Sequence, residues 1–143
     1  MSEVRDDTTT AVRLRLALVR LTRALRQGNT AGLSPSQLSA LSTIDDFGPL
    51  RVSAVAVHES VGAPVATRVV ASLEELGLVT RESDPVDKRA TLVALSAHGQ
   101  TTIDQLWTQR TRGLSSRLER LSDEERQSLE EALPALEKMT REL

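Results

Sequence analysis

The stretch that decides the fold is residues 64–95, which read PVATRVVASLEELGLVTRESDPVDKRATLVAL. It opens with a proline, a residue favoured at the first position of a helix, and apolar residues then recur on one helical face. These apolar residues are Val65, Val69, Leu73 and Leu76. Gly77 ends that helix, and the segments 78–82 and 89–95 have the pattern of strands on either side of the polar loop 83–88. The stretch therefore predicts a helix followed by a β-hairpin.

Two shorter helices are predicted upstream. Residues 34–37, Ser-Pro-Ser-Gln, combine a capping serine, a proline at the first helical position and a glutamine at the third, which is the pattern of a capping box. That helix should run to about Phe47, before a Gly-Pro pair. An extended piece at 50–52 comes next, and a short helix is expected from Ser53 to Ser60. Two short helices joined by a glycine-containing turn form a helix-turn-helix, and the hairpin supplies the wing of a winged helix-turn-helix.

Long amphipathic helices are predicted on both sides of this lobe. The segment 11–27 holds five arginines and no acid, and its leucines recur at spacings of three and four. The segment 96–143 predicts one helix that Ser96 caps and a second helix that begins after a capping box at 122–125. Residues 1–10, with three acids and three consecutive threonines, are expected to form a disordered arm.

The apolar stripes of these terminal helices exceed what a single chain of this length needs to cover its core. We therefore expect the terminal helices to form the interface of a homodimer. The leucines expected there are Leu14, Leu18, Leu21, Leu129, Leu133 and Leu136. The alternative is that the terminal helices pack on the winged-helix lobe of their own chain.

Composition excludes several classes of protein. The chain has no cysteine, which rules out disulfides, thiolate metal sites and cysteine nucleophiles. Its two histidines, His58 and His98, have no neighbours at metal-ligand spacing, and no nucleophile–base set or phosphate-binding glycine loop is present. Neither a metal, a cofactor nor an enzymatic activity is therefore expected. The short apolar runs and the polar N-terminus predict a cytoplasmic protein without a membrane span.

Several short motifs occur in a fixed order along the chain. In the hairpin region they are Leu76-Gly77-Leu78-Val79-Thr80-Arg81, Asp84-Pro85, Asp87-Lys88-Arg89 and Val93-Ala94-Leu95-Ser96. Upstream they are Leu33-Ser34 with Gln37 and Leu41, then Val55-Ala56, and then Thr67-Arg68 with Leu73. Their order and spacing closely resemble the signature of the MarR (multiple antibiotic resistance regulator) family. The resemblance covers 33–99 residue by residue and the flanking helices by pattern; at Val55 the family usually has leucine.

The resemblance implies a mainly α fold with a small β-hairpin wing. Residues 11–143 would then form a single domain, in which 33–95 is the DNA-binding lobe and the segments 11–27 and 96–143 are long dimerisation helices. It also implies a homodimer that binds double-stranded DNA as a transcriptional regulator, in the first place a repressor of a pseudo-palindromic operator.

Two places in the lobe are expected to contact DNA. The second helix of a helix-turn-helix enters the major groove with its first residues, which here are Pro64, Val65, Thr67 and Arg68. At the wing tip, Arg89 is expected to reach a minor groove beside Lys88, while Asp87 holds the Arg89 guanidinium by a charge-assisted hydrogen bond. Two alternatives stay open: Val65 either touches a thymine methyl or packs in the core, and the tip is either a DNA contact or a solvated charged loop.

The charge balance leaves a rival function open. The formal net charge is −2, and residues 51–95 hold five basic and six acidic side chains. DNA binding then depends on where the charged side chains point and not on their sum. The cations Arg68, Lys88 and Arg89 would face the duplex. A winged-helix module that binds another protein instead of DNA is the alternative, and a small-molecule enzyme is the third hypothesis. The acids expected to face away from DNA are Glu74, Glu75 and Glu82.

The resemblance also implies an effector site. Relatives often bind small aromatic acids or lipophilic compounds between the dimer helices and the DNA-binding lobe. In this chain Phe47, His58 and Trp107 would line such a pocket. Phe47 and Trp107 are the only residues of the chain that are Phe, Trp or Tyr. The alternative is that both belong to the hydrophobic core.

Overall fold

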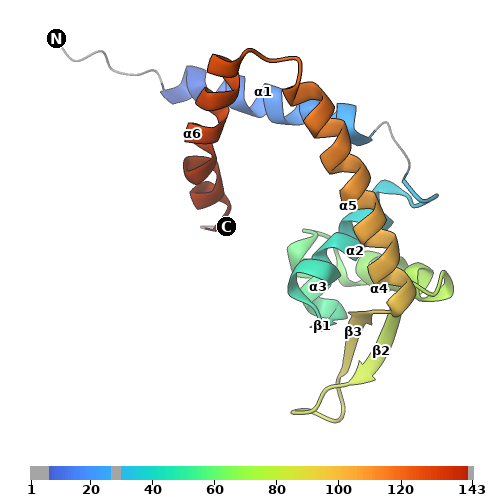
Figure 1. Cartoon of the computed structure of the whole chain (residues 1–143). Helices are drawn as coiled ribbons and strands as arrows, with labels where there is room; N and C mark the ends of the chain where they lie inside the picture. Colours follow the sequence, from blue (N-terminus) through green and yellow to red (C-terminus); the bar gives the residue numbers. More distant parts are fainter. Residues whose placement is uncertain (1–6, 27–29, 142–143) are drawn as a thin grey trace.

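The structure is a computed structural model that describes residues 7–26 and 30–141. The three strands form one antiparallel sheet in the order β1-β3-β2. The protein is therefore mainly α with a small β wing, as the sequence predicted, and α3 and α4 form the helix-turn-helix (Figure 1). The elements are, in chain order, α1 (Asp7–Arg26), α2 (Pro35–Phe47), β1 (Leu50–Arg51), α3 (Val52–His58), α4 (Ala63–Glu75), β2 (Val79–Ser83), β3 (Thr91–Leu95), α5 (Ala97–Leu118) and α6 (Asp123–Arg141).

Helices α2, α3 and α4 enclose an aliphatic core against the base of the sheet and the first half of α5. Burial of an aliphatic side chain stabilises a fold by about 1.5–3 kcal/mol. The predicted capping box of α2 is confirmed, since Ser34 Oγ accepts from the Gln37 N–H at 3.2 Å and Gln37 Oε1 accepts from the Ser34 N–H at 2.9 Å. Gln37 Nε2 also donates to Ser72 Oγ at 3.0 Å, which ties the start of α2 to α4. The largest fully buried side chains are Leu41, Val55, Val70, Leu73, Val93 and Ile103.

The wing is the antiparallel pair β2–β3. Val79 lies opposite Leu95 at its base, and Ser83 lies opposite Thr91 near its tip. β1 adds a short third strand beside β3. Only the first residue of β2 is buried, because only the base of the hairpin covers the core. The rest of the hairpin projects from the lobe at the end opposite α1 and α6 (Figure 1).

A close junction joins α4, the wing and α5. Gly77 follows α4 with a φ of +71°, a conformation that favours glycine. Ser96, the N-cap of α5, donates from Oγ to the Gly77 carbonyl at 2.5 Å and accepts from the Gly99 N–H at 2.9 Å. Gly99 lies so close to the start of β2 that a Cβ atom at this position would overlap with the carbonyl oxygen of Leu78. Glycine is therefore required at position 99 by the close approach of two backbones.

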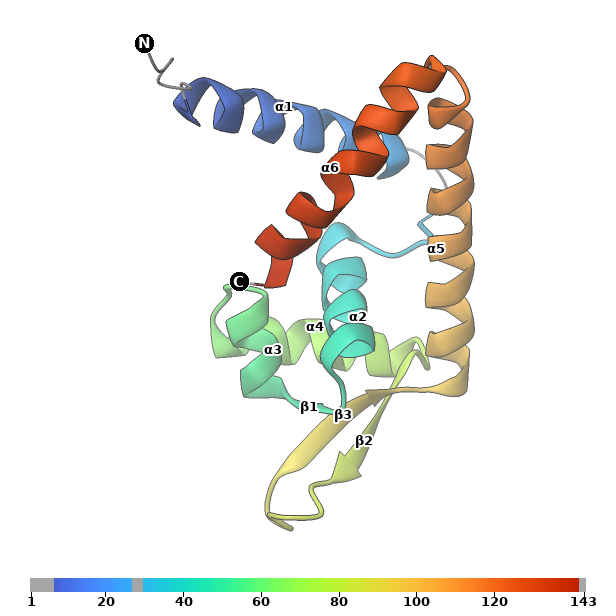
Figure 2. The same cartoon turned by 60° about the vertical axis from the view of Figure 1, so that its left-hand side comes forward.

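Helix α5 extends from the lobe to the region where α1 and α6 lie (Figure 2). Near that end, Arg117 Nη2 donates to the Ala24 carbonyl of α1 at 3.5 Å. The second predicted capping box is confirmed at the start of α6, where Ser122 and Glu125 exchange hydrogen bonds of 2.9 and 3.2 Å. α1 contains no buried residue.

No helix in the described part of the chain is both long and apolar enough to cross a membrane.

Two helix starts differ from the sequence-based expectation. α1 begins at Asp7, so residues 7–10 of the expected disordered arm are helical, whereas residues 1–6 lie outside the described residues. The carboxylate of Asp7 in the first turn is favourable for the helix dipole, and this offsets the low helix propensity of the threonines. α3 begins at Val52 and not after a Ser53 cap, because the helix starts directly where the pairing of β1 with β3 ends.

Gly99→Ala should destabilise the fold by about 1–3 kcal/mol, because two backbone segments must move apart to admit the methyl group. The matched control is Gly113→Ala on the same helix, where a Cβ atom would lie 3.5 Å from the Leu25 side chain, an ordinary contact. Alanine there should be neutral or stabilising, because it has the higher helix propensity. Urea denaturation of both variants measures the difference, and equal stability of the two would contradict the junction described above.

Candidate nucleic-acid interface

The start of α4 presents the residues expected to read the major groove. Pro64, Val65, Thr67 and Arg68 are all exposed, while Ala66 on the same turn is buried and anchors the helix to the core. Val65 is 44% exposed, so the alternative that it packs in the core is wrong. Thr67 Oγ1 donates to the Ala63 carbonyl at 2.8 Å, which leaves its lone pairs free to accept.

The turn that precedes α4 contains a feature that sequence reasoning missed. Ser60 adopts a φ of +53°, in the left-handed region that non-glycine residues rarely occupy. Two backbone hydrogen bonds hold it there, from the Ser60 N–H to the Val57 carbonyl at 3.1 Å and from the Val61 N–H to the Ala56 carbonyl at 3.0 Å. The turn therefore sets the direction in which α4 leaves α3. No local motif marks a serine that takes this conformation.

The wing tip is organised around Asp84. This carboxylate is buried, and its Oδ1 atom accepts from the backbone N–H groups of Val86 at 2.8 Å and Asp87 at 3.3 Å. Its Oδ2 atom accepts from Arg51 Nη2 at 2.8 Å. The Arg51 hydrogen bond, followed by those from the backbone, holds the pKa of Asp84 below its usual range. The stabilising contribution of the charged carboxylate is therefore fully present above the ordinary carboxyl pKa of about 4, and it is lost as the pH falls through the lowered pKa.

The expected role of Asp87 is wrong in one respect. Asp87 does not hold the Arg89 guanidinium: its Oδ1 atom accepts from the Arg89 backbone N–H at 3.1 Å, and its Oδ2 atom lies 3.5 Å from Arg51 Nη2. The reason is tertiary, because β1 lies beside β3 and brings Arg51 to the tip. Arg51 was missed in the sequence, where no motif connects it to a loop 33 residues away. The Arg89 side chain is thus left exposed at the tip, beside the exposed Lys88.

The ion pairs of the lobe separate its cations into two groups. Of the five basic side chains in 51–95, Arg51 is paired with Asp84, and Arg81 Nε lies 2.8 Å from Glu74 Oε2. The other three have no ion pair within the described part of the chain, and they lie at the start of α4 and at the wing tip. They are Arg68, Lys88 and Arg89.

A cavity of about 340 Å³ lies between the end of α1, the start of α2 and α5. Two of the residues that line it contact each other: the guanidinium carbon of Arg110 lies over the Trp107 ring, 5.0 Å from the centre of that ring. Burial, and then the nearby charge of Arg26, lower the pKa of Arg110. The lining contains two arginines and no carboxylate: Arg26, Thr30, Leu33, Pro35, Leu38, Ser39, Ser42, Trp107 and Arg110.

The three residues expected to line one effector pocket are separated. Phe47 and His58, at the ends of α2 and α3, stack on each other with ring centres 4.4 Å apart, whereas Trp107 lines the cavity described above without either of them. Spacing along the chain does not reveal which ends of helices meet. The core alternative is also wrong, since Phe47 is 55% and Trp107 is 37% exposed.

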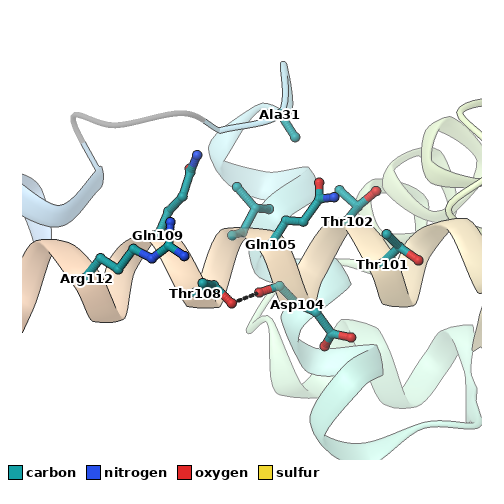
Figure 3. A pocket seen from close by; sticks show the side chains of 9 residues that line it. Ala31, Thr101, Thr102, Asp104, Gln105, Thr108, Gln109 and Arg112 are labelled. Atoms are coloured by element: carbon teal, nitrogen blue, oxygen red, sulfur yellow. Dashed lines mark hydrogen bonds between the residues drawn. The ribbon is translucent and has the colours of Figure 1, made fainter.

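A second cavity, of about 450 Å³, follows a polar face of α5. Thr101, Asp104, Gln105, Thr108 and Arg112 line it together with Ala31 of the loop before α2, and Thr108 donates to the Asp104 carbonyl at 2.8 Å (Figure 3). This lining offers a carboxylate and no aromatic ring. The Trp107 cavity is therefore the better match to a lipophilic ligand.

Most of the leucines expected at a dimer interface are exposed in the single chain. Leu18, Leu21, Leu129 and Leu133 are exposed, and Leu14 and Leu136 are half-buried. Because α1 buries no residue, the alternative that it packs on the lobe of its own chain is wrong.

Comparisons with known proteins agree with this geometry. An HTH-type transcriptional regulator of Mycobacterium leprae is 40% identical over 128 residues, which cover 89% of this chain and 90% of that protein. A second one, from Mycobacterium tuberculosis, is 39% identical with the same coverage. The structure of a MarR family protein from Bacillus stearothermophilus matches 99% of both chains with a TM-score of 0.81 at 25% identity.

Fold and relatives together define the class of protein as a winged helix-turn-helix transcriptional regulator. A sequence profile of the MarR family matches residues 33–91, and the chain belongs to this family of regulators. Among the described residues, no group of three or more His, Asp or Glu side chains is placed to hold a metal ion.

Arg51→Ala should loosen the wing tip, because Asp84 then keeps only its two backbone partners. We expect hydrogen exchange at the amides of Val86 and Asp87 to become about tenfold faster, as for the loss of one charge-assisted hydrogen bond. Arg81→Ala is the matched control, since it removes an ion pair of the same length at the base of the wing. Unchanged exchange in Arg51→Ala would show that the tip does not depend on this contact.

Proposed function

We propose that this regulator is a cytoplasmic homodimer that binds a pseudo-palindromic operator in double-stranded DNA and represses transcription. The observation that carries the proposal is the position of the cations without an acidic partner among the described residues: Arg68 on α4, and Lys88 and Arg89 at the wing tip. The start of the second helix of a helix-turn-helix enters the major groove, and a guanidinium at the wing tip gains from the negative potential of a narrow minor groove.

A homodimer is part of this proposal because a single lobe offers few phosphate contacts. The exposed leucines of α1 and α6 are the surface on which a second copy would close. A two-fold dimer would place two α4 helices about one DNA turn apart, roughly 34–36 Å, and would double the number of cations at the duplex.

Sequence recognition by α4 would rest on few groups. Arg68 can bond guanine or a phosphate, and the methyl groups of Val65 can contact thymine. Thr67 contributes mainly as an acceptor, because its hydroxyl proton is directed to the Ala63 carbonyl. Sequence-dependent DNA shape would then supply a larger share of the specificity.

Arg89→Ala should weaken operator binding by at least about tenfold while the fold stays intact, because one minor-groove contact is lost in each half of the dimer. Fluorescence anisotropy on the intergenic DNA upstream of the gene, against scrambled DNA of equal length and at two salt concentrations, measures this. The parent should bind its own DNA preferentially, with affinity falling as salt rises by a slope of about −0.9 per neutralised phosphate.

Arg81→Ala is the control for Arg89→Ala, because its guanidinium is already paired with Glu74. Equal losses in the two variants would remove the wing tip from the proposal. Absence of binding to either DNA at low salt would favour a winged-helix module that binds another protein.

We further propose that a small lipophilic anion releases the operator by binding in the Trp107 cavity. Arg26 and Arg110 would face the acid, and Leu33, Pro35 and Leu38 would contact the apolar part. The lowered pKa of Arg110, caused by burial and by Arg26, indicates two cations that lack a counter-charge, which an anion would supply.

Trp107 is the only tryptophan, so its fluorescence reports on this cavity. Benzoate should quench Trp107 and release operator DNA, whereas its neutral analogue benzamide should do neither. Arg110→Gln should weaken benzoate binding about tenfold by removing a charged hydrogen bond, and Arg112→Gln in the polar cavity should not. Quenching of equal strength by acid and amide would contradict the proposed role of the arginines.

A further inference from the structure

The wing tip carries an apolar side chain in water beside two cations. Val86 is 94% exposed, more than any other large hydrophobic side chain of the described residues. Lys88 and Arg89 follow it closely in the chain, and neither has an ion pair within the described part of the chain. The tip lies at the end of the hairpin that projects away from α1 and α6, so no terminal helix of the chain covers it (Figure 1).

The backbone that carries Val86 is held in place on both sides. The Val86 N–H donates to Asp84 Oδ1 at 2.8 Å, and the carboxylate of Asp84 is itself buried. The Asp84 N–H donates to the Ala90 carbonyl at 3.0 Å, which closes the loop. Pro85, directly before Val86, has its φ fixed by the pyrrolidine ring. The exposed methyl groups therefore sit on a braced loop, and little backbone freedom is lost when they contact a partner.

The side chains of the tip loop offer donors and methyl groups but no uncommitted acceptor. Asp84 and Asp87 are the only side chains of this loop that can accept a hydrogen bond. The Asp84 oxygens accept from two backbone N–H groups and from Arg51. The Asp87 oxygens accept from the Arg89 N–H at 3.1 Å and lie 3.5 Å from the Arg51 guanidinium. A partner therefore meets the side-chain donors of two cations and the methyl groups of one valine.

The minor groove of DNA distinguishes its base pairs by a single donor. A·T and T·A pairs present only the acceptors adenine N3 and thymine O2 in this groove, whereas a G·C pair adds the guanine N2 amino group. Donors at the wing tip can satisfy the acceptors of an A·T pair. The guanine amino group would instead meet a methyl group or another donor, and a donor that loses its water without gaining an acceptor is costly.

We propose that Val86 is a specificity-determining residue of the wing, which excludes G·C pairs from the minor groove beneath the tip because its methyl groups cannot accept from the guanine amino group. The inference rests on the proposed binding of operator DNA and adds the chemical feature that the wing selects against. DNA is the occupant because the cations beside Val86 have no acidic partner among the described residues and complement phosphates. Arg89 then contributes affinity, and Val86 contributes selection.

Val86→Thr tests this role, because threonine keeps the shape of valine and replaces one methyl group with a hydroxyl that can accept. A binding-site selection from randomised DNA first gives the duplex that the parent prefers. Each A·T pair of this duplex is then replaced by G·C or by inosine·cytosine, which has the major-groove edge of G·C but lacks the amino group. Fluorescence anisotropy measures the affinity of parent and variant for each duplex.

The parent should bind about tenfold more weakly when G·C replaces an A·T pair beneath the tip, and inosine·cytosine at the same position should restore binding. At positions read in the major groove, both replacements should weaken binding alike. Val86→Thr should lose most of the penalty at the positions beneath the tip, because its hydroxyl accepts from the guanine amino group. Val57→Thr is the matched control, since Val57 is 78% exposed on α3 and lies outside the tip, and it should discriminate like the parent.

Two results would overturn the role of Val86 and leave operator binding intact. One is a preferred duplex in which no position separates G·C from inosine·cytosine, and the other is a Val86→Thr variant that keeps the full discrimination of the parent. A parent that selects no duplex from randomised DNA would instead refute the proposed function itself.

Discussion

The close approach of α5 to the start of the wing is the constraint on which the rest of the molecule depends. Gly99 sits against the Leu78 carbonyl, and the Ser96 hydroxyl bonds the Gly77 carbonyl. The end of α4, the first residue of β2, the last residue of β3 and the start of α5 therefore meet at one point. A rigid junction of this kind transmits any displacement of the long helix to both the helix-turn-helix and the wing, because packed backbones shift together.

The ion pairs of the lobe explain how a protein with a net charge of −2 still presents cations without an acidic partner among the described residues. Arg51 and Arg81 are held by acidic partners, and these ion pairs serve the wing's own structure. The same pairs neutralise two acids, Asp84 and Glu74, that would otherwise repel phosphates. The remaining cations lie where a helix-turn-helix and a wing meet DNA. Tertiary ion pairing, and not the composition, thus decides which cations of the lobe remain without an acidic partner.

The terminal helices have a different energetic role. Helices α1 and α6 bury almost no side chain within one chain, and the lobe already has its own core around Leu41 and Leu73. Exposed apolar stripes of this kind are typical of a surface that binds another surface. Since α5 connects these helices to the junction at Gly99, the proposed association between chains would be coupled to the geometry of the DNA-binding surface.

The sequence by itself determined the elements and the family. The patterns that revealed them are helical periodicity, the capping boxes at Ser34 and Ser122 and the hairpin pattern. All of these depend on residues close together in the chain, so they can be recognised from the sequence without the structure. Tertiary structure alone decided that Arg51 braces the wing, that Trp107 lies apart from Phe47 and His58, and that Gly99 must be glycine. These facts arise from contacts between segments distant in the chain, and such contacts depend on how helices and strands pack and not on the spacing of residues along them.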